Sequence, residues 1–528
     1  MGFADLRSRY STSEPVIVND LPPGTASVVC RTAFGETHLA GFEGVSAVFP
    51  GLPAGTHVLE AWSRDGELLA EEYTTVSRLP GDDPVMAFAT SFGPGQVGRV
   101  LSWLRSLRCT VVQFYDWMQQ YSKPLPEKEV YSDPLGRQLS RSSLKHLVSG
   151  VRELGAVAQA YAPICAAEPA FAEAHQDWLL FGNDGMAQHL GNLLQIMDPA
   201  NTAWQEHWID SYRAAADSVG FDGFHLDTYG YPRRPFDYIG NPVPIRHAYG
   251  AFIERVRDAV PLATLSFNQV NGVPFGLEVP RTPSFRYAEV WPPNDGWRHL
   301  EGLIARSAAR EPWAGGALAL YPPVWGGDRK DAVRTVTLTE AVTTSLGAGL
   351  LVLGDDSGVL RDPYYPSYEQ LTGSEASKVL DWHRFALRCR DLFRHGEDTS
   401  WCDVDDPNGA VRIEAPGAAV SPEPEAGTLF VRVVRTGPTI AISCIDLRGS
   451  TNGSWGAPTA TGDLREAIIR VLVAKPARCR AEAAVLGASG GRFQEVELAP
   501  ACHLEGNAAE LRLPIVEGWS VARFDESY

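Results

Sequence analysis

Between residues 85 and 395 the sequence alternates short apolar runs with longer stretches in which apolar residues recur at helical spacing. This alternation is typical of βα units, in which parallel strands form a sheet and helices cover it. Eight such units in roughly 300 residues are the number and the size of a (β/α)8 TIM barrel. The predicted strands cover residues 86–92, 110–115, 157–162, 223–226, 263–267, 285–290, 317–321 and 350–353.

Helix-like segments lie between most of these strands, at residues 101–107, 142–154, 204–219, 248–259, 298–309 and 332–345 among others. A doubly wound open sheet is the alternative arrangement of βα units. Nucleotide-binding sheets of that kind carry a glycine-rich loop after a strand, and no GxGxxG or Walker sequence follows any predicted strand. The barrel is therefore the favoured fold.

The segments on both sides of this region have the shorter period of β-strands. Residues 26–32 and 57–62 alternate apolar and polar side chains, and Pro- and Gly-rich turns separate such segments. Residues 79–84 have the composition of a linker, and residues 415–427 that of a loop. After a helix around residues 377–394, predicted strands return at residues 411–414, 428–434, 439–443, 468–472, 495–498 and 519–524.

The chain length also requires more than one domain, because single cores stop growing at roughly 250–300 residues and this chain has 528. We predict an N-terminal immunoglobulin-like β-sandwich at residues 1–80 and a (β/α)8 barrel at residues 85–395. A C-terminal antiparallel β-sandwich of Greek-key type follows at residues 396–528.

The charge of the chain makes anionic binding partners less suitable, because 64 acidic residues outnumber 46 basic ones and leave a net charge of −18. Such a chain is poorly suited to nucleic-acid phosphates or to an anionic membrane surface, and no apolar run is long enough to span a bilayer. A neutral polysaccharide is a compatible partner, although maintaining solubility is the more common role of acidity.

Cysteine usage and the N-terminus indicate the compartment. The eight cysteines are scattered without metal-ligand spacing and are expected to be mostly reduced thiols. No HExxH or EF-hand pattern occurs, so we expect no metal and no cofactor. No apolar signal segment follows Met1, which predicts a cytoplasmic protein, although a secreted protein without its signal would look the same.

Acidic residues stand at the ends of four predicted strands, where the active site of a TIM barrel lies. They are Asp116, Asp227, Glu289 and the pair Asp355 and Asp356. Asp227 ends its strand at the predicted barrel mouth, where a carboxylate can attack an anomeric carbon. Capping the next helix is an equally good explanation for an isolated aspartate.

Glu289 is flanked by Tyr287 and Trp291, and an aromatic, apolar surround raises the pKa of a carboxyl group. That property suits a general acid. A structural ion pair with Arg281 or Arg286 is the alternative. Together, however, two carboxyl groups from two strands meet the requirement of a glycosidase for one nucleophile or base and one acid.

Several short motifs then give the chain a resemblance to glycoside hydrolase family 66, which contains dextranases and cycloisomaltooligosaccharide glucanotransferases. Each motif is short, but the ordered series is fairly specific. The motifs are QFYDW at 113–117 with KPL at 123–125, MDPAN at 197–201 with Trp204, FDGFHLD at 221–227, FN at 267–268, YAEVW at 287–291 and LGAG at 346–349 leading into LGD at 353–355.

The resemblance implies a retaining mechanism on α-1,6-linked glucan, with Asp227 as nucleophile and Glu289 as general acid/base. It also implies flanking β-domains. The chain departs from the family pattern at Met118, where many relatives have histidine, and at His225 and Tyr229. These departures leave the linkage and the subsite preference open, but not the two carboxyl groups.

Six further residues are candidates for substrate binding. Asp116 can bind sugar hydroxyls between Tyr115 and Trp117, or pair with Lys123. For the other candidates, the competing role is structural: a turn, a helix cap or packing in the core. His225, just before Asp227, is assigned no catalytic role. The complete set is Asp116, Tyr115, Trp117, Asn268, Trp291 and Asp355.

Three other functions compete with hydrolysis. A transglycosylase would form cyclic or transferred isomaltooligosaccharides, but the inserted carbohydrate-binding module of the cyclising family members has no room between residues 317–321 and 350–353. A catalytically inactive glucan-binding protein is disfavoured by the presence of both carboxyl groups. Action on another α-glucoside inside the cell is the third alternative.

Overall fold

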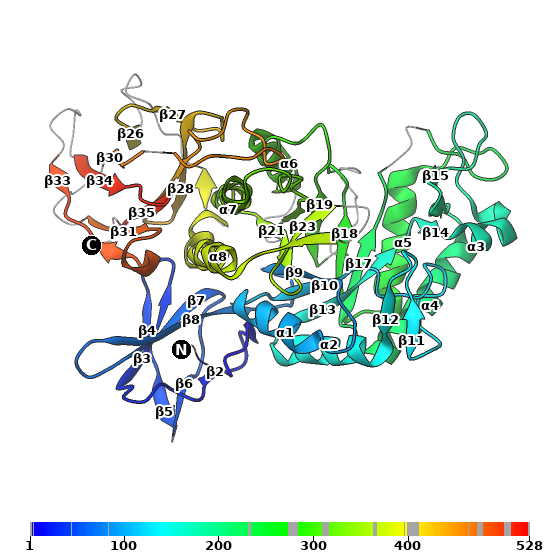
Figure 1. The fold of residues 1–528 in the computed structure, drawn as a ribbon, viewed down its shortest axis with the longest axis horizontal. Coiled ribbons are helices and arrows are strands. Elements are labelled where there is room, and N and C mark those ends of the chain that lie inside the picture. Colours follow the sequence, from blue (N-terminus) through cyan, green and yellow to red (C-terminus); the bar gives the residue numbers. More distant parts are fainter. Residues whose placement is uncertain are drawn as a thin grey trace.

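The computed structural model describes residues 3–525 except 4, 44, 83, 231–233, 273–283, 309–315, 363–366, 395, 399–410, 463, 473–478 and 501–507. The molecule is elongated, with two β-rich regions together at one end and a curled sheet with helices around it at the other (Figure 1). The chain forms a mixed α/β fold. No helix in the described part of the chain is long and apolar enough to cross a membrane.

The curled sheet contains all eight strands predicted from the apolar runs, and each pairs in parallel with the strand before it in the chain. After β21, a single residue leads into β22, and Gly354 of β22 pairs in parallel with Phe88 of β9. The last parallel strand of the sheet therefore pairs with β9, the first strand. The strands are β9 (Met86–Ala89), β10 (Val111–Phe114), β13 (Val157–Pro163), β17 (Gly223–Asp227), β18 (Thr264–Asn268), β19 (Phe285–Glu289), β20 (Ala317–Ala319), β21 (Gly349–Leu351) and β22 (Leu353–Gly354).

The strands read as continuous apolar runs because both faces of the sheet are covered. Phe88 and Val111 belong to the hydrophobic cluster inside the curled sheet, together with tyrosines of other strands. Ala87 and Val112, their neighbours in the chain, belong to the cluster beneath the helices. Successive side chains thus point to opposite faces, as the pleat requires.

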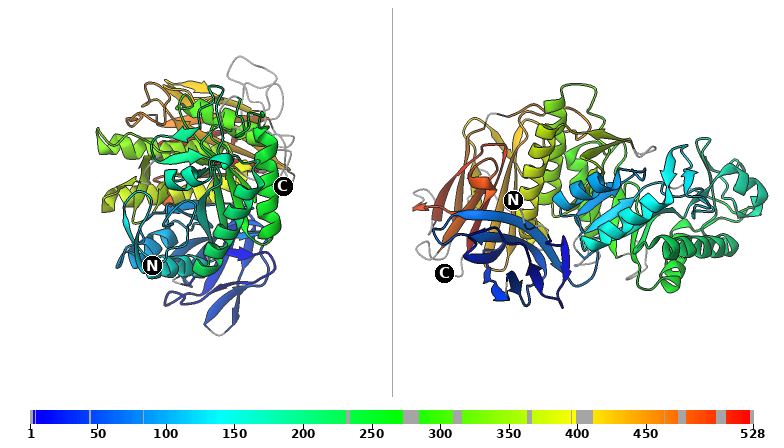
Figure 2. Two further views of the ribbon diagram at one scale, coloured as in Figure 1. Left: turned by 90° about the vertical axis from the view of Figure 1, so that its right-hand side faces the viewer. Right: turned by 60° about the horizontal axis from the view of Figure 1, so that its bottom comes forward.

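Helices follow the strands and cover the outer face of the sheet (Figures 1 and 2). The MDPAN motif has a structural role here, because the Asn201 side chain accepts hydrogen bonds from the backbone of Ala203 and Trp204 and caps α4. The helices are α1 (Val97–Ser106), α2 (Arg141–Glu153), α3 (Pro169–Ala174), α4 (Thr202–Val219), α5 (Ile245–Ala259), α6 (Trp297–Ala308), α7 (Arg329–Ser345) and α8 (Gly373–Arg394).

Short strands and 3-10 turns lie in the connections between these elements, and the sequence analysis did not predict them. One group, including α3, fills the connection between β13 and α4 at the far end of the molecule (Figure 1). The short elements are β11 (Val130–Ser132), β12 (Gln138–Ser140), β14 (Ala166–Ala167), η1 (Gln176–Trp178), β15 (His189–Leu190), β16 (Leu194–Ile196), β23 (Gly358–Asp362) and β24 (Ser367–Gln370). A further 3-10 turn, η3 (Ser489–Gly491), lies in the C-terminal region between β31 and β32.

The N-terminal region forms a five-stranded sheet, in the order β1-β8-β7-β3-β4, and a three-stranded sheet, in the order β2-β6-β5. Val18 and Phe49 of the smaller sheet and Cys30 and Leu59 of the larger one share a hydrophobic core. The strands are β1 (Arg9–Ser11), β2 (Val16–Val18), β3 (Ser27–Thr32), β4 (Thr37–Leu39), β5 (Gly41–Glu43), β6 (Ser46–Phe49), β7 (Gly55–Trp62) and β8 (Leu68–Ser77).

The C-terminal region also has two sheets, one in the order β25-β28-β29-β35-β31-β32 with β27 beside β28, and one in the order β26-β30-β34-β33. Both contribute to one core. The prediction of a loop at residues 415–427 was wrong in part, because this segment contains β27. The strands are β25 (Glu397–Asp398), β26 (Val411–Glu414), β27 (Ala419–Ser421), β28 (Thr428–Thr436), β29 (Thr439–Asp446), β30 (Glu466–Leu472), β31 (Arg480–Val485), β32 (Gln494–Glu495), β33 (Ala499–Pro500), β34 (Ala508–Pro514) and β35 (Trp519–Asp525).

Candidate active site

Three neighbouring strands of the curled sheet end in polar side chains. Asp227 is the last residue of β17, Asn268 the last of β18 and Glu289 the last of β19. The three strands are adjacent and parallel, so their carboxyl ends lie at one edge of the sheet. The two acidic residues predicted from the sequence are therefore brought together, with Asn268 between them.

The Asn268 amide joins the two carboxyl groups. Its Nδ2 donates to Asp227 Oδ1 over 2.7 Å and to Glu289 Oε2 over 3.1 Å. Its Oδ1 accepts from the backbone N–H of Glu289 over 3.0 Å, which fixes the orientation of the amide. Because both oxygens contact one nitrogen, they are separated by no more than about 6 Å.

Tyr161 holds the second oxygen of Asp227. Its hydroxyl donates to Asp227 Oδ2 over 2.8 Å. Tyr161 lies on β13, the strand next to β17, in register with His225. Each oxygen of the Asp227 carboxylate thus has a side-chain donor, and a backbone hydrogen bond from Thr228 adds a further one, so the group is held in one orientation.

Glu289 accepts three hydrogen bonds. The Tyr321 hydroxyl donates to Oε1 over 2.6 Å, while the Trp291 indole N–H and the Asn268 amide donate to Oε2, each over 3.1 Å. The aromatic neighbours predicted to surround Glu289 therefore do more than exclude water, since Trp291 also supplies a donor. Arg281, one of the two arginines suggested as ion-pair partners of Glu289, lies outside the described residues.

Three tyrosines inside the sheet support this arrangement from behind. The Tyr115 hydroxyl lies 3.0 Å from that of Tyr321 and 3.3 Å from that of Tyr287, so the hydroxyl groups form a connected chain that ends at Glu289. His225 lies beside Tyr287, with ring centroids 4.4 Å apart, and its Nδ1 is 3.1 Å from Ser266 Oγ. Burial lowers the pKa of His225 to about 3, so the ring is neutral.

Burial raises the pKa of both Asp227 and Glu289. Repulsion between the two carboxylates adds to the rise at Asp227, and the hydrogen bonds from Tyr161 and Asn268 oppose it. At Glu289 the three donors oppose the effect of burial without cancelling it. Both carboxyl groups are therefore protonated more readily than free ones, and their repulsion disfavours the doubly charged state, as a nucleophile and an acid require together.

Asp116 follows the end of β10 and is buried. Its Oδ1 accepts from the Tyr121 hydroxyl over 3.4 Å, and burial raises its pKa to about 6 against the opposing charge of Arg137. Lys123 forms an ion pair with Glu127 at 2.5 Å. The suggested pairing of Asp116 with Lys123 was therefore wrong, and its role in binding sugar remains a prediction.

Two of the predicted substrate-binding residues are corrected. Trp117 has no exposed surface, packs on Phe221 and donates its indole N–H to the Tyr161 backbone carbonyl over 3.0 Å. Asp355 is also fully buried, and its carboxylate accepts four hydrogen bonds from the backbone and hydroxyl groups of Thr90 and Ser91. Neither side chain can touch a substrate in this arrangement, and both stabilise the fold.

Sequence reasoning missed Tyr161 and Tyr321, which bind the two carboxylates directly. Both lay within or at the ends of predicted strands, at residues 157–162 and 317–321. They were overlooked because strand ends were searched for acidic residues only. A search for hydroxyl and amide donors at the same positions would have found them.

Comparison with known proteins gives the family. A model described as glycosyl hydrolase family 66 matches residues 60–522, which is most of the chain. The chain belongs to glycosyl hydrolase family 66. The resemblance carried by the short motifs is thereby confirmed.

Similar proteins in this family carry two activity names. A cycloisomaltooligosaccharide glucanotransferase from Niallia circulans is 26% identical over 258 residues, which cover 44% of this chain and 27% of that protein. A dextranase from Streptococcus salivarius is 29% identical over 195 residues, covering 33% and 24%. The matched segments thus span about a quarter of the length of these curated relatives.

Solved structures show the same fold. A Paenibacillus cycloisomaltooligosaccharide glucanotransferase, complexed with cycloisomaltoheptaose, superposes with a TM-score of 0.80 at 17% identity and covers 99% of both chains. A maltogenic α-amylase from Thermotoga neapolitana superposes with a TM-score of 0.53 at 12% identity, covering 85% of this chain and all of that one. The first likeness extends over the N-terminal and C-terminal β-regions as well as the curled sheet.

Proposed function

We propose that this family 66 member is a retaining glycoside hydrolase that cleaves α-1,6-glucosidic bonds of dextran or isomaltooligosaccharides. The reaction takes place at the mouth of a (β/α)8 barrel that an N-terminal and a C-terminal β-sandwich flank. Family membership and the names of its relatives support the class of activity on α-glucans. The linkage and the mechanism are supported by the geometry of the site.

The observation that carries the proposal is the Asn268 bridge between Asp227 and Glu289. Carboxyl groups about 5–5.5 Å apart are typical of retaining enzymes, while inverting enzymes need about 6.5–9.5 Å to admit a water molecule between nucleophile and sugar. Nearest oxygens within about 6 Å of each other favour the retaining spacing.

In the first step Glu289 donates its proton to the glycosidic oxygen while Asp227 attacks the anomeric carbon. The bond between that carbon and the leaving oxygen breaks, and the sugar becomes an ester of Asp227. In the second step the Glu289 carboxylate takes a proton from water, the hydroxide attacks the anomeric carbon, and Asp227 leaves as a carboxylate. Two inversions give net retention.

The surrounding donors adjust the two carboxyl groups for these steps. Tyr161 and Asn268 hold Asp227 in position and favour its charged form. Tyr321 and Trp291 hydrogen-bond Glu289 and stabilise it as the carboxylate that the second step requires. Tyr321 and Tyr161 are positioning residues in this account, since they act through the carboxyl groups.

Substrate contacts are proposed for the remaining predicted residues. Trp291 is half-buried and can present its ring to a sugar while its N–H binds Glu289. Asp116 and Tyr115 lie at the carboxyl end of β10 and would contact the sugar in the −1 subsite, while the fully buried Asn268 would act through the two carboxyl groups that it bridges.

Hydrolysis of dextran by the purified chain tests the proposal, with isomaltooligosaccharides, starch and pullulan as comparison substrates. Asp227→Asn and Glu289→Gln should each lower kcat by at least about 1,000-fold. The control is Asp210→Asn, which removes an exposed carboxylate of α4 that pairs with Arg213. Proton NMR of the first product should show the α-anomer. A β-anomer, or starch cleavage without dextran cleavage, would contradict the proposal.

Transglycosylation is the second candidate, because two of the similar proteins are glucanotransferases. It would follow the same first step, with a sugar hydroxyl in place of water in the second. Mass spectrometry separates the two outcomes, since a cyclic isomaltooligosaccharide weighs one water less than its linear counterpart. Cyclic products as the main species would replace hydrolysis by glucan transfer.

A further inference from the structure

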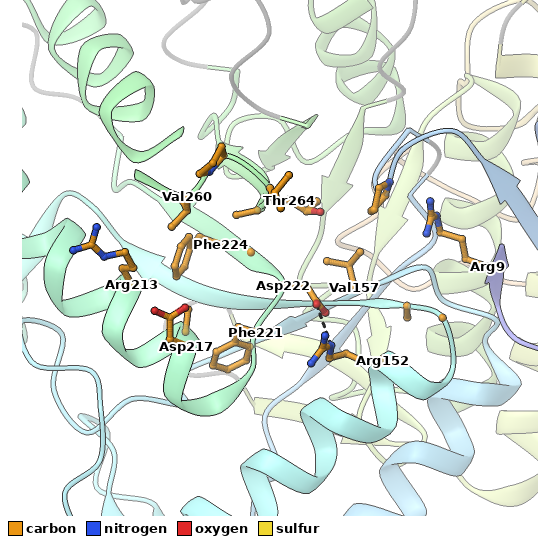
Figure 3. Close-up of a pocket in the computed structure, with 18 of the residues that line it drawn as sticks. Arg9, Arg152, Val157, Arg213, Asp217, Phe221, Asp222, Phe224, Val260 and Thr264 are labelled. Carbon is orange, nitrogen blue, oxygen red and sulfur yellow. Dashed lines mark ion pairs between the residues drawn. The ribbon is translucent and has the colours of Figure 1, made fainter. Parts of the chain in front are cut away.

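A cavity lies at the opposite end of the curled sheet from the candidate active site. It has a volume of about 750 Å³ and is lined by the first residues of three strands, Val157, Gly223 and Thr264 (Figure 3). The last residues of β17 and β18 are Asp227 and Asn268. A strand of five residues spans roughly 13 Å, so the two sites are separate.

The walls of this cavity are held rigidly where the N-terminal region meets the barrel. The Ser8 backbone N–H donates to the Leu154 carbonyl over 2.7 Å, and Arg108 donates to the Leu6 carbonyl over 2.7 Å. Gly155 has a φ of 77°, and a Cβ there would meet the Arg9 carbonyl oxygen at 2.5 Å. The cavity is therefore formed in advance, which lowers the cost of binding a ligand.

Arginine dominates the charge of the cavity, in a chain whose net charge is −18. Four arginines and two aspartates line it, with Arg9 at one end and Arg213 and Asp217 at the other (Figure 3). Most of these arginines are neutralised. Arg152 pairs with Asp222 at 3.1 Å, Arg7 with Glu14 at 2.7 Å and Arg213 with Asp210 at 3.0 Å.

Arg9 differs from the other three because its partners are neutral. Its Nε donates to Ser77 Oγ over 2.7 Å and its Nη2 to the Ser77 carbonyl over 3.5 Å. No carboxylate lies within ion-pair distance of it among the described residues. Its nearest acidic neighbours are engaged elsewhere, Glu14 by Arg7 and Asp82 by the backbone N–H of Leu79. A half-buried guanidinium of this kind offers an incoming anion a charge-assisted hydrogen bond.

The rest of the cavity suits the body of a small polar molecule. Val157, Phe221 and Val260 give it apolar walls, while the Asp217 carboxylate can accept hydrogen bonds from hydroxyl groups. A bare inorganic anion would leave most of the volume empty. A polyanion would find one charge partner in Arg9, while the Asp217 carboxylate would repel its further charges.

We propose that this cavity binds a sugar-sized ligand that carries a single anionic group, which Arg9 receives. A sugar phosphate and a sugar carboxylate share this chemistry. The inference does not depend on the reaction proposed for Asp227 and Glu289.

Calorimetric titration of the whole chain at low salt tests the inference with four probes: glucose 6-phosphate, glucuronate, glucose and inorganic phosphate. At least one of the two anionic sugars should bind, and the tighter one identifies the anion. Glucose and inorganic phosphate should bind at least about tenfold more weakly. Failure of both anionic sugars to bind would overturn the inference, and so would equal affinity for glucose or for phosphate.

Two variants of the cavity and one control variant test whether the ligand binds in this cavity. Arg9→Gln should weaken binding by about tenfold, because it removes the charge but keeps a donor for Ser77. Leu262→Asp adds a repelling charge at the rim, and it should not affect folding because Leu262 is 97% exposed. Arg512→Gln makes the same charge change as Arg9→Gln at an exposed site of the C-terminal region, so it should bind like the unmodified protein. Unchanged affinity in both Arg9→Gln and Leu262→Asp would contradict the assignment.

Discussion

At the scale of single residues, Asn268 is the side chain that links the two candidate catalytic carboxyl groups. Its fully buried amide contacts both Asp227 and Glu289. Asn268→Ala should lower kcat/KM on dextran by about 100-fold, the usual effect of removing one preorganised donor from a transition state. Activity within twofold of the unmodified chain, with circular dichroism showing an intact fold, would contradict this role.

Tyr161 and Tyr321 should each control one limb of the pH dependence of kcat/KM. Burial raises the pKa of both carboxyl groups, and hydrogen bonds from Tyr161 and Tyr321 hold these values down. Tyr161→Phe should therefore raise the pKa of Asp227 and move the acidic limb of kcat/KM to higher pH. Tyr321→Phe should raise the pKa of Glu289, which must be protonated, and move the basic limb to higher pH. Profiles that change in height alone would assign the tyrosines a packing role.

The candidate residues that the structure brings together differ from Trp117 and Asp355 in their backbone. Asp227, Asn268 and Glu289 lie within paired strands, where side chains alternate regularly and strand ends are predictable. Trp117 follows Asp116, which has a φ of 42°, and Asp355 itself has a φ of 44°. Such left-handed residues break the alternation, so the direction of these side chains could not be predicted.

At the scale of elements, Asp355 joins the end of the sheet to its beginning. Its carboxylate connects the residue after β22 with Thr90 and Ser91, which follow β9. Asp355→Ala would leave buried donors without acceptors and should lower the free energy of unfolding by about 2–4 kcal/mol. Urea denaturation measures this loss. A large rise in KM without loss of stability would restore the original prediction that Asp355 binds substrate.

A buried ion pair joins helices α7 and α8. Glu340 lies 2.5 Å from His383 Nδ1, and His383 Nε2 donates to the Leu107 carbonyl over 2.8 Å, so both ring nitrogens donate. Burial alone would lower the pKa of His383, but the charge and hydrogen bond of Glu340 outweigh it and the pKa is raised.

The sign of this shift gives a prediction for stability. A raised pKa contributes stability that is complete below about pH 6.5, the unfolded value, and is lost as the pH rises through the folded value. The melting temperature should therefore fall above neutral pH, and His383→Gln should make that fall shallower. An identical pH dependence in the variant would show that His383 does not carry the effect.

The elements themselves were predictable to different degrees. The eight strands of the curled sheet were found because each is an apolar run buried on both faces. The short strands between β13 and α4 were not, because two or three residues carry no periodic signal. The same limit explains why β27 was predicted as loop.

At the scale of the whole molecule, buried charges fix the N-terminal region to the curled sheet and its helices. Arg108 pairs with Glu72 at 2.6 Å with both side chains almost fully buried, and Arg388 pairs with Glu71 at 2.5 Å. The Thr56 backbone N–H also donates to Asp391 of α8 over 2.6 Å. The C-terminal region completes the assembly, since the Arg523 guanidinium donates to the Ala33 carbonyl.

These contacts predict that the N-terminal region unfolds together with the curled sheet and its helices. Glu72→Gln would leave the buried Arg108 charge without its partner and should lower the free energy of unfolding by about 3 kcal/mol. Calorimetry should show one transition that moves as a whole. A separate early transition for the N-terminal region would show that it is an independent unit. Sequence analysis could not find these contacts, because three of the four join residues more than 300 positions apart and all depend on the final docking.

The central claim is that Asp227 and Glu289 act on one glucose ring, with Asp227 as the nucleophile. A 5-fluoro-α-glucosyl fluoride tests it most directly, because the fluorine at C5 slows the second step and traps the ester. Mass spectrometry of the digested protein should locate the sugar on Asp227, and Glu289→Gln should still accept the label since fluoride needs no proton to leave. A sugar on any other residue, or turnover of the fluoride with inversion and without an adduct, would contradict the account.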